Sequence, residues 1–320
     1  MTYHVLVPDS VHPSAVEILE AAGLKVSAPG QMKRPETLAA IADADALIIR
    51  SATKADAELL NAAPKLKAIA RAGVGVDNVD LNVATQKGIA VMNTPDGNSV
   101  ATAELAFSLM LSLARAIPQA HASMQAGKWD RKTFMGTELR GKTLGVVGFG
   151  RIGRAVAKRA QAFEMQVIAH DPYIPLDIAE DFGVKLVSLD ELYAQADYIT
   201  LHTIVNNETR HLINKDTLAR MKKGVRIINA ARGALINDAD LAEALKSGQV
   251  AGAALDVYAE EPPPADHPLV GLPNVIDTPH LGASTEEAQV AVAVEAAQLI
   301  VAALTRSEYK NVVNTDVLKR

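Results

Sequence analysis

Short apolar runs alternate along the chain with longer segments in which apolar residues recur at helical spacing. This alternation is typical of parallel β-strands joined by crossover helices, because a strand that is buried on both faces of a sheet is apolar throughout. The predicted strands are His4–Pro8, Ala46–Ile49, Ala68–Ala70, Ala90–Met92, Thr143–Val147, Gln166–His170, Tyr198–Leu201, Val225–Asn229 and Gly252–Leu255. The pattern therefore predicts an α/β fold.

Two turn-rich stretches divide this series of elements. Residues 93–98 precede a predicted helix, Ser99–Arg115, and residues 262–282 precede another, Glu286–Leu304. If the chain crosses between two domains at both places, its N-terminal part and its last helix belong to one domain and its middle to the other. We therefore expect a discontinuous domain, residues 1–97 plus 286–320, and an inserted domain, residues 98–285.

Composition narrows the class of protein. The 320 residues are 49% hydrophobic, enough for two domains around a cleft, and the 32 basic and 37 acidic side chains give a net charge of −5 with no run of one sign. Nucleic-acid and membrane partners are therefore not expected. The chain has no cysteine, which excludes disulfides, thiolate catalysis and thiolate-ligated zinc, and no metal site is predicted. With no signal-peptide pattern and no apolar stretch judged long enough to span a membrane, we expect a cytoplasmic protein.

A glycine-rich turn follows the predicted strand Thr143–Val147. Gly148, Gly150 and Gly153 have the spacing G-x-G-x-x-G and lead into a predicted helix over residues 154–163. In this motif the first glycine permits a tight turn, the second lets the backbone approach a pyrophosphate, and the third lets helix and strand pack closely. The N-terminus of the helix also attracts negative charge. By itself the motif is equally compatible with a merely tight turn.

The next strand strengthens the nucleotide interpretation because it ends in Asp171. A carboxylate at about this distance accepts hydrogen bonds from the adenosine ribose, although an ordinary strand-end turn is the alternative. Pro172 and Tyr173 follow, so no Arg or Lys is at hand to pair with a 2′-phosphate. The sequence therefore predicts a Rossmann domain over residues 98–285 that binds NAD in preference to NADP.

If the NAD-dependent reaction is the oxidation of a hydroxy acid, it also requires a cation for the carboxylate and a base for the hydroxyl proton. Arg232 follows the predicted strand Val225–Asn229, at the sheet edge where open parallel sheets bind ligands. A guanidinium there can hold a carboxylate with two parallel hydrogen bonds. The alternative is a surface arginine in a turn.

His280 and Glu261 are the candidate base and its partner. A carboxylate beside a histidine stabilises the imidazolium, so the pair can take a proton as hydride leaves. Asp256, at the end of the strand Gly252–Leu255, is the alternative partner, but its position suits a hydrogen bond to the nicotinamide amide. A histidine between Pro279 and Leu281 can equally be structural.

These motifs resemble the D-isomer-specific 2-hydroxyacid dehydrogenase family over nearly the whole chain. The resemblance rests on the glycine loop, on Asn229-Ala230-Ala231-Arg232-Gly233, on Leu255-Asp256-Val257 with Glu261-Pro262, and on Pro279-His280. It implies two Rossmann-like, doubly wound parallel-sheet domains with a cleft between them. It further implies that Arg232 binds the substrate carboxylate, that His280 is the acid/base and that Glu261 is its partner. The implied cofactor contacts are Arg151, Ile152, Asp171, Thr203, Ala230, Asp256 and His280.

Longer stretches resemble a branch of the family that acts on a phosphorylated 2-hydroxy acid: Arg50-Ser51-Ala52-Thr53-Lys54, residues 71–80 and Trp129-Asp130-Arg131-Lys132. The turn Gly73-Val74-Gly75 offers backbone N–H groups to the substrate carboxylate, although Val74 lacks the hydroxyl of the threonine found there in some members. Arg50, Arg71 and Arg131 supply positive charge for a phosphate, with solvated surface arginines as the alternative. We therefore expect Arg50, Ser51, Arg71, Gly73, Val74, Gly75 and Arg131 to bind substrate, and residues 1–97 plus 286–320 to form the substrate-binding domain.

Three expectations concern partners and alternatives. The region from Ser99 through Met124, interpreted as a four-helix region with apolar residues on more than one face, predicts a homodimer or a dimer of dimers, with burial inside one large domain as the alternative. Many members of the branch continue into regulatory domains, so we expect this chain to lack a regulatory serine site. The competing functions are a glyoxylate or hydroxypyruvate reductase and, from another class, an NAD-sensing corepressor-like binding protein.

Overall fold

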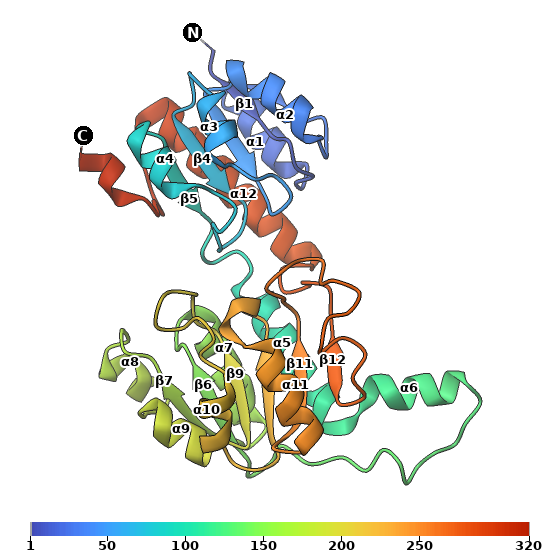
Figure 1. Ribbon diagram of the computed structural model, residues 1–320. Coiled ribbons are helices and arrows are strands. Elements are labelled where there is room, and N and C mark those ends of the chain that lie inside the picture. The colour runs from blue at the N-terminus through green and yellow to red at the C-terminus, as the bar shows by residue number, and fades with distance from the viewer. Residues whose placement is uncertain (1, 320) are drawn as a thin grey trace. The chain divides into compact units, whose positions relative to one another are not determined.

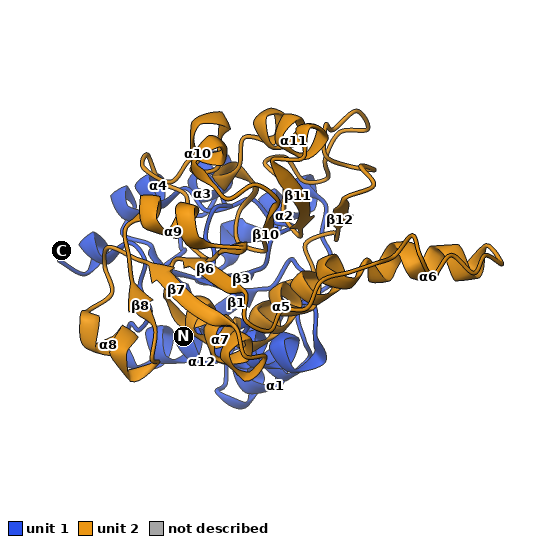
Figure 2. Ribbon diagram, turned by 90° about the horizontal axis from the view of Figure 1, so that it is seen from below, with its two compact units in different colours: residues 1–98, 283–320 blue, residues 99–282 orange. Residues whose placement is uncertain are grey.

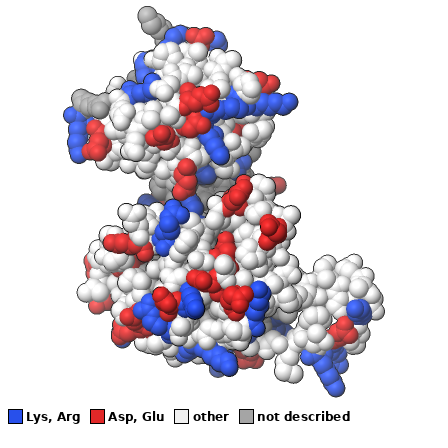
Figure 3. Space-filling model, in the orientation of Figure 1, with Lys and Arg blue, Asp and Glu red and all other residues white. Residues whose placement is uncertain are grey.

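The computed structural model describes residues 2–319 and divides the chain into two compact units (Figures 1 and 2). Unit 1 contains the chain up to Asn98 together with the chain from Ala283 onward, and unit 2 contains Ser99–Gly282. On the face drawn in Figure 3, basic and acidic side chains are mixed over each unit.

Unit 1 is built on a five-stranded parallel sheet with the order β2-β1-β3-β4-β5. Its strands are β1 His4–Leu6, β2 Lys25–Ser27, β3 Ala46–Ile49, β4 Ala68–Arg71 and β5 Ala90–Asn93. Its helices are α1 Ser14–Ala21, α2 Arg34–Ala40, α3 Ala57–Asn61, α4 Leu81–Gln86 and α12 Glu286–Arg306, with short 3₁₀ turns at Ile41–Asp43 and Thr315–Lys319. Since the strand order changes direction at β1, the sheet is doubly wound.

Both faces of this sheet are covered. Alternate strand residues such as Ile48 and Ala70 pack with α1 and α12, whereas their neighbours Leu47 and Ile69 pack with α3 and α4. All four residues of β3 are buried, which explains why that strand reads as a continuous apolar run.

Helix α12 corrects one expectation, that no apolar stretch reaches membrane-spanning length. By length and composition alone this helix is long and apolar enough to cross a membrane. Its apolar residues, Val292, Ala296 and Ile300 among them, are instead buried in the core of unit 1. The apolar character of α12 is therefore accounted for by packing within the unit.

Unit 2 is built on a seven-stranded parallel sheet with the order β12-β11-β10-β9-β6-β7-β8. Its strands are β6 Thr143–Val147, β7 Gln166–His170, β8 Lys185–Leu186, β9 Tyr198–Leu201, β10 Val225–Asn229, β11 Val250–Leu255 and β12 Val275–Asp277. Its helices are α5 Ser99–Arg115, α6 Ile117–Gln125, α7 Arg151–Ala162, α8 Leu176–Asp181, α9 Leu189–Gln195, α10 Lys215–Arg220 and α11 Asp238–Ser247, with a 3₁₀ turn at Gly233–Leu235. Helices α5, α7 and α8 pack on one face and α9, α10 and α11 on the other. The predicted pair of Rossmann-like parallel-sheet domains is confirmed.

The region from Ser99 through Met124 contains two helices, α5 and α6, rather than four. The apolar residues of α5 pack into the core of unit 2, because Phe107 and Met110 are buried and Leu105, Leu111 and Leu113 lie against the same cluster. Apart from Val100 of α5, the large exposed apolar residues of this part of the chain lie on α6 and on the segment after it. There Ile117, Met124, Trp129 and Met135 expose 53%, 52%, 74% and 88% of their surface.

Three strands were missed by the sequence analysis, and all three are edge strands: β2, β8 and β12. Each has only two or three residues, and exposed polar positions such as Lys25 and Lys185 interrupt its apolar pattern. An edge strand has one unpaired side and one partly solvated face, so it lacks the apolar run that marks a central parallel strand.

Candidate active site

The glycine loop of unit 2 connects β6 to α7. A side chain on Gly148, whose φ is +90°, would place Cβ 2.6 Å from the carbonyl carbon of His202, and one on Gly153 would place Cβ 2.1 Å from the oxygen of Gly148. Nothing lies within 4 Å of the corresponding position at Gly150. The loop is therefore closed against the protein at its first and third glycines and open at its second, where a pyrophosphate would approach the backbone.

Asp171 lies beside this loop. One oxygen of its carboxylate accepts a 2.8 Å hydrogen bond from the backbone N–H of Phe149, between the first two glycines, and the other accepts one of 2.9 Å from Tyr173. The side chain remains partly exposed. These bonds hold a negative charge at the carboxyl end of β7, as a dinucleotide ribose requires.

The other predicted cofactor residues are placed along the same edge of the sheet. Arg151 and Ile152 open α7, directly after Gly150, and the backbone nitrogen of Thr203 lies 2.8 Å from the Cβ position at Gly148. Ala230 follows β10 and Asp256 follows β11. The carboxyl ends of parallel strands meet at one sheet edge, so the topology brings these positions to one side of unit 2.

Arg232 stands in a turn that is fixed by the buried side chain of Asn229. The Asn229 amide nitrogen donates a 2.9 Å hydrogen bond to the carbonyl of Arg232, and its amide oxygen accepts one of 3.1 Å from the N–H of Ala231. The next residue, Gly233, crosses the backbone of Tyr258 and Ala259 so closely that a Cβ there would lie 1.9 Å from the carbonyl carbon of Tyr258. The turn that carries Arg232 therefore lies against the segment that leads to Glu261.

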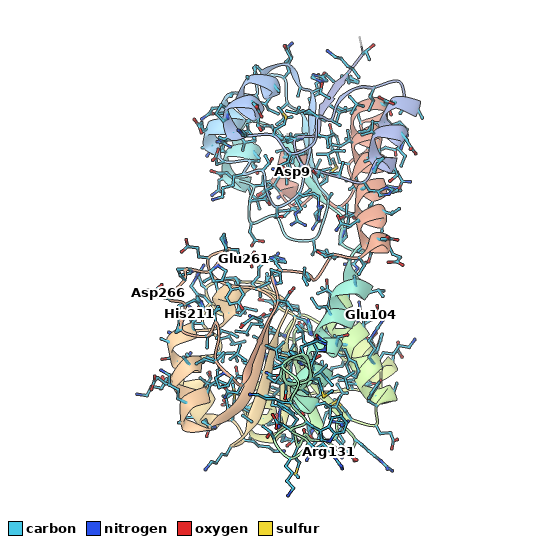
Figure 4. The ribbon with its side chains drawn as sticks, turned by 90° about the vertical axis from the view of Figure 1, so that its right-hand side faces the viewer. Asp9, Glu104, Arg131, His211, Glu261 and Asp266 are labelled. Carbon is cyan, nitrogen blue, oxygen red and sulfur yellow. The ribbon has the colours of Figure 1, made fainter. Side chains whose placement is uncertain are left out.

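His280 and Glu261 are in direct contact. The imidazole Nδ1 of His280 lies 2.7 Å from Oε2 of Glu261, and 47% and 38% of the two side chains are exposed. With the ring neutral, Nδ1–H donates to the carboxylate and Nε2 keeps a free lone pair. Glu261 lies at the end of unit 2 where the loops after β11 and β12 meet (Figure 4). The geometry thus brings the predicted base and its predicted partner into hydrogen-bond contact.

Asp256 does not contact the imidazole, although it was the alternative partner. Its buried carboxylate accepts hydrogen bonds from the Thr278 hydroxyl at 2.6 Å and from the N–H groups of Leu281 and Gly282 at 2.7 and 2.9 Å. Burial raises the pKa of Asp256, and these three bonds oppose the rise. Asp256 therefore holds the segment that carries His280, whose φ is +54°.

In unit 1, Arg50 begins a loop that is clamped from both sides. The buried carboxylate of Asp9 accepts hydrogen bonds from the N–H of Arg50 at 2.6 Å and from the N–H and hydroxyl of Thr53 at 3.3 and 2.5 Å. The amide nitrogen of Asn78 donates to the carbonyls of Arg50 and Thr53 at 2.6 and 2.7 Å. The Arg50 side chain, with His12 and the first turn of α12, lines an open pocket of about 690 Å³, and Ser51 in the same loop is exposed.

Arg71 ends β4, and its guanidinium lies across the turn that follows. The φ of Gly73 is +144°, a backbone conformation that favours glycine, and a Cβ there would displace the Arg71 guanidinium, whose Nη1 lies 1.5 Å from the Cβ position. The carbonyls of Gly73 and Val74 accept hydrogen bonds from Thr94 and Asn93, at 3.1 and 2.7 Å, which fixes the turn that continues to Gly75.

Arg131 is not brought to the His280–Glu261 pair within the chain. It is exposed on the segment after α6, near the end of unit 2 opposite Glu261 (Figure 4). If Arg131 contacts a substrate at His280, that substrate must be bound by a second copy of the chain.

The fold and the loops can now be compared with known proteins. Residues 107–282 match the model of the D-isomer specific 2-hydroxyacid dehydrogenase NAD-binding domain. The chain belongs to this family. The match covers more than half of the chain, and NAD is the cofactor that this domain binds.

The chain is also similar to whole proteins. It is 50% identical over 314 residues to the D-3-phosphoglycerate dehydrogenase of Rattus norvegicus, covering 98% of this chain and 59% of the relative. It is 53% identical over 311 residues to that of Methanocaldococcus jannaschii, covering 97% and 59%. A solved glyoxylate reductase from Paecilomyes thermophila superposes with a TM-score of 0.89 at 34% identity, covering 98% of each chain. The chain therefore spans about three fifths of the length of the phosphoglycerate dehydrogenases that it matches.

Several residues that shape the candidate site were not predicted. Asp9, Asn78 and Asn229 each bond to backbone groups of a loop that carries a predicted arginine. Each stands at or just after a strand end or in a turn, where Asp and Asn commonly bond to nearby backbone. That signal could have marked all three as loop supports. It could not have shown which loop Asp9 and Asn78 support, because their partners lie far away in sequence, whereas Asn229 bonds to residues two and three positions further on.

Proposed function

We propose that this chain catalyses the NAD-dependent oxidation of D-3-phosphoglycerate to 3-phosphohydroxypyruvate, the first step of phosphorylated serine biosynthesis. The observation that carries the proposal is the 2.7 Å contact between His280 and Glu261 in the unit that contains the NAD-binding domain. The identity of about 50% to D-3-phosphoglycerate dehydrogenases supports the choice of substrate.

In the proposed reaction Nε2 of His280 takes the hydroxyl proton of the substrate as the hydrogen on the same carbon leaves as hydride, which converts the alcohol to a ketone. NAD, when bound, accepts the hydride. Glu261 orients the ring through Nδ1–H and stabilises the imidazolium that forms. Arg232 binds the substrate carboxylate, for which a guanidinium offers two parallel donors.

Residues of unit 1 would recognise the rest of the substrate. A bound phosphate is strongly charged and needs fixed donors, and Arg50 is held in a clamped loop beside an open pocket. Arg71 and the N–H groups of the Gly73–Gly75 turn are further candidates, with Ser51 in the Arg50 loop. We assign substrate binding to unit 1 on this basis, and cofactor binding and proton transfer to unit 2.

A matched pair of substrates tests the proposal. 3-Phosphoglycerate and glycerate differ only in the phosphate, so the rates of NADH formation with the two acids measure how much the phosphate contributes to kcat/KM. Lactate and 2-hydroxyglutarate are assayed in the same panel. We expect kcat/KM to be highest for 3-phosphoglycerate. Higher efficiency with glycerate, or with glyoxylate or hydroxypyruvate in the reverse direction, would identify the alternative reductase. NADH binding without turnover of any acid would identify a binding protein.

We also infer that the chain forms a homodimer, or a dimer of dimers, through α6 and the segment that follows it. Trp129 and Met135 are largely exposed there, and exposed large apolar side chains are typical of association surfaces. Light scattering should give at least twice the chain mass, and a Trp129→Glu, Met135→Glu double variant should shift it toward the monomer. A monomeric unmodified chain would contradict this inference.

A cytoplasmic location remains a prediction.

A further inference from the structure

Tyr258 bonds both to Glu261 and to the segment that precedes His280. It stands two residues after Asp256 and three before Glu261, and its backbone N–H donates a 3.1 Å hydrogen bond to Oε1 of Glu261. The other carboxylate oxygen, Oε2, faces Nδ1 of His280. The backbone of Tyr258 therefore fixes the carboxylate on the side away from the imidazole.

The side chain of Tyr258 bonds to the segment that leads to His280, the other member of the pair. Its hydroxyl donates a 2.5 Å hydrogen bond to Oδ1 of Asp277, three residues before His280. Together with the backbone that joins Asp277 to His280, these contacts close a ring that runs from Tyr258 through Glu261 and His280 to Asp277 and back. Hydrogen bonds to a charged acceptor are short and comparatively strong.

The ring of Tyr258 is itself held in place. It is 9% exposed, and His267 packs edge-on against it at a centroid distance of 5.2 Å. Nε2 of His267 is 3.1 Å from the carboxylate of Asp238, at the start of α11. The backbone of Tyr258 also meets Gly233, next to Arg232. The loops of Arg232, Glu261 and His280 thus all meet at Tyr258.

We propose that the Tyr258–Asp277 hydrogen bond is a brace that sets the geometry of the His280–Glu261 pair, with Tyr258 as a positioning residue for the proton transfer. The kinetic consequences of this inference rest on the proposed function. Its structural content concerns only Tyr258, Glu261, His280 and Asp277. Burial, and next the hydrogen bond to Asp277, raise the pKa of the Tyr258 phenol above its usual range, so the hydroxyl is a donor at every pH at which the enzyme would work.

The first test measures the tautomer of the His280 ring and needs no turnover. Long-range ¹H–¹⁵N spectra of histidine-labelled protein, at a pH where the ring is neutral, give the fraction of Nδ1–H tautomer, and a His280→Gln variant assigns the signal. In the unmodified chain we expect Nδ1–H to predominate because Glu261 accepts from it. Tyr258→Phe keeps the packed ring and removes only the donor, so this fraction should fall.

Matched variants separate the brace from general effects of substitution. Tyr193→Phe is the control, because Tyr193 is also a buried tyrosine of unit 2 and its hydroxyl has no hydrogen-bond partner among the described residues. Asp277 is exposed, so Asp277→Ala removes the same bond without touching the buried ring. Asp277→Asn keeps an acceptor oxygen and should largely restore the tautomer fraction.

The kinetic arm predicts which constant changes. Tyr258→Phe and Asp277→Ala should each lower kcat about tenfold, since small misplacement of a catalytic group is costly, while the Kd for NADH stays within about twofold. The double variant should lose no more than either single variant, because both remove one bond.

An unchanged tautomer fraction in both Tyr258→Phe and Asp277→Ala would overturn the brace whatever the enzyme does. So would equal losses of kcat and NADH affinity, or a Tyr193→Phe variant that behaves like Tyr258→Phe. An unmodified chain that turns over no 2-hydroxy acid would instead overturn the proposed function, and the tautomer measurement would still decide the brace.

Discussion

The two units share one architecture but build the carboxyl edges of their sheets differently. In unit 2 the turn after β6 is Gly148-Phe149-Gly150, where small residues leave backbone open to a ligand. In unit 1 the turn after β1 contains the buried carboxylate of Asp9, whose oxygens are taken up by the Arg50–Thr53 loop. At these two turns, unit 2 exposes its backbone, whereas unit 1 uses a carboxylate to hold a neighbouring loop.

This difference shows that a parallel α/β sheet supplies positions at an edge, while the loop residues decide what is bound there. In unit 2 an open backbone, Asp171 and the His280–Glu261 pair suit a dinucleotide and proton transfer. In unit 1, Arg50 stands in a loop held by hydrogen bonds and Arg71 ends β4. Both guanidinium groups suit anionic groups of a substrate. If this division is right, substitutions at the two edges should affect different constants.

The largest effect is expected at the edge of unit 2. His280→Ala should lower kcat about 10²- to 10⁴-fold, the usual contribution of a positioned acid/base, because no other group would take the hydroxyl proton. NADH affinity, measured by fluorescence titration, should be nearly unchanged. Glu261→Gln should act more mildly, since its amide oxygen still accepts from Nδ1–H but carries no charge. Normal turnover by His280→Ala would show that proton transfer does not depend on this edge.

A smaller and more selective effect is expected at the edge of unit 1. Arg50→Ala removes one charged partner of the phosphate, which costs roughly 1.5 to 3 kcal/mol, or about ten- to a hundredfold in affinity. The KM for 3-phosphoglycerate should therefore rise by that factor, whereas the constants for glycerate should change little. Lys87→Ala, which removes an exposed charge from the same unit, is the control. An equal rise in KM for both substrates would show that Arg50 has a structural role. It would also contradict the proposed division of roles between the two units.

The same contrast explains how much the sequence could predict. Central strands such as β6, β9 and β10 were predicted with their observed ends, because burial on both faces produces an apolar run. The His280–Glu261 contact was also predicted, from motifs that the family shares. Asp9 and Tyr258 were not, because their roles depend on partners brought close only by the fold. A local turn signal can mark Asp9 as a loop support, but a single sequence does not reveal the distant partner of either residue.

The preference for NAD over NADP tests the role assigned to Asp171 at the edge of unit 2. The unmodified chain should use NAD more efficiently than NADP, because the Asp171 carboxylate lies where it would repel a 2′-phosphate. Asp171→Asn should shift the ratio of the two kcat/KM values toward NADP by about tenfold, which corresponds to about 1.4 kcal/mol. Asp177→Asn, at an exposed carboxylate of α8, controls for the loss of charge. Equal or better efficiency with NADP in the unmodified chain would refute this assignment.

The last expected effect is on stability and not on a kinetic constant, and it concerns a polar side chain at each edge. Asp9 in unit 1 has both carboxylate oxygens hydrogen-bonded, but His202, directly after β9 in unit 2, is less well satisfied. Its Nε2 lies 2.8 Å from the Thr200 hydroxyl, and its Nδ1 is buried without a hydrogen-bond partner among the described residues. Burial lowers the pKa of His202 to about 3, from the ordinary value of 6.5.

This depressed pKa predicts that acid weakens unit 2 through His202. Between about pH 6.5 and pH 3 the unfolded chain binds a proton at this ring that the folded chain does not. The free energy of unfolding should therefore be fully retained above that window and fall with pH inside it, by at most about 1.4 kcal/mol per pH unit. His202→Asn should flatten the fall, whereas His121→Asn, at an exposed histidine of α6, should not. Hydrogen exchange of the β6 and β9 amides measures the stability of unit 2 separately from that of unit 1. Parallel pH dependence in the His202→Asn and unmodified chains would show that the buried ring is not what makes this edge sensitive to acid.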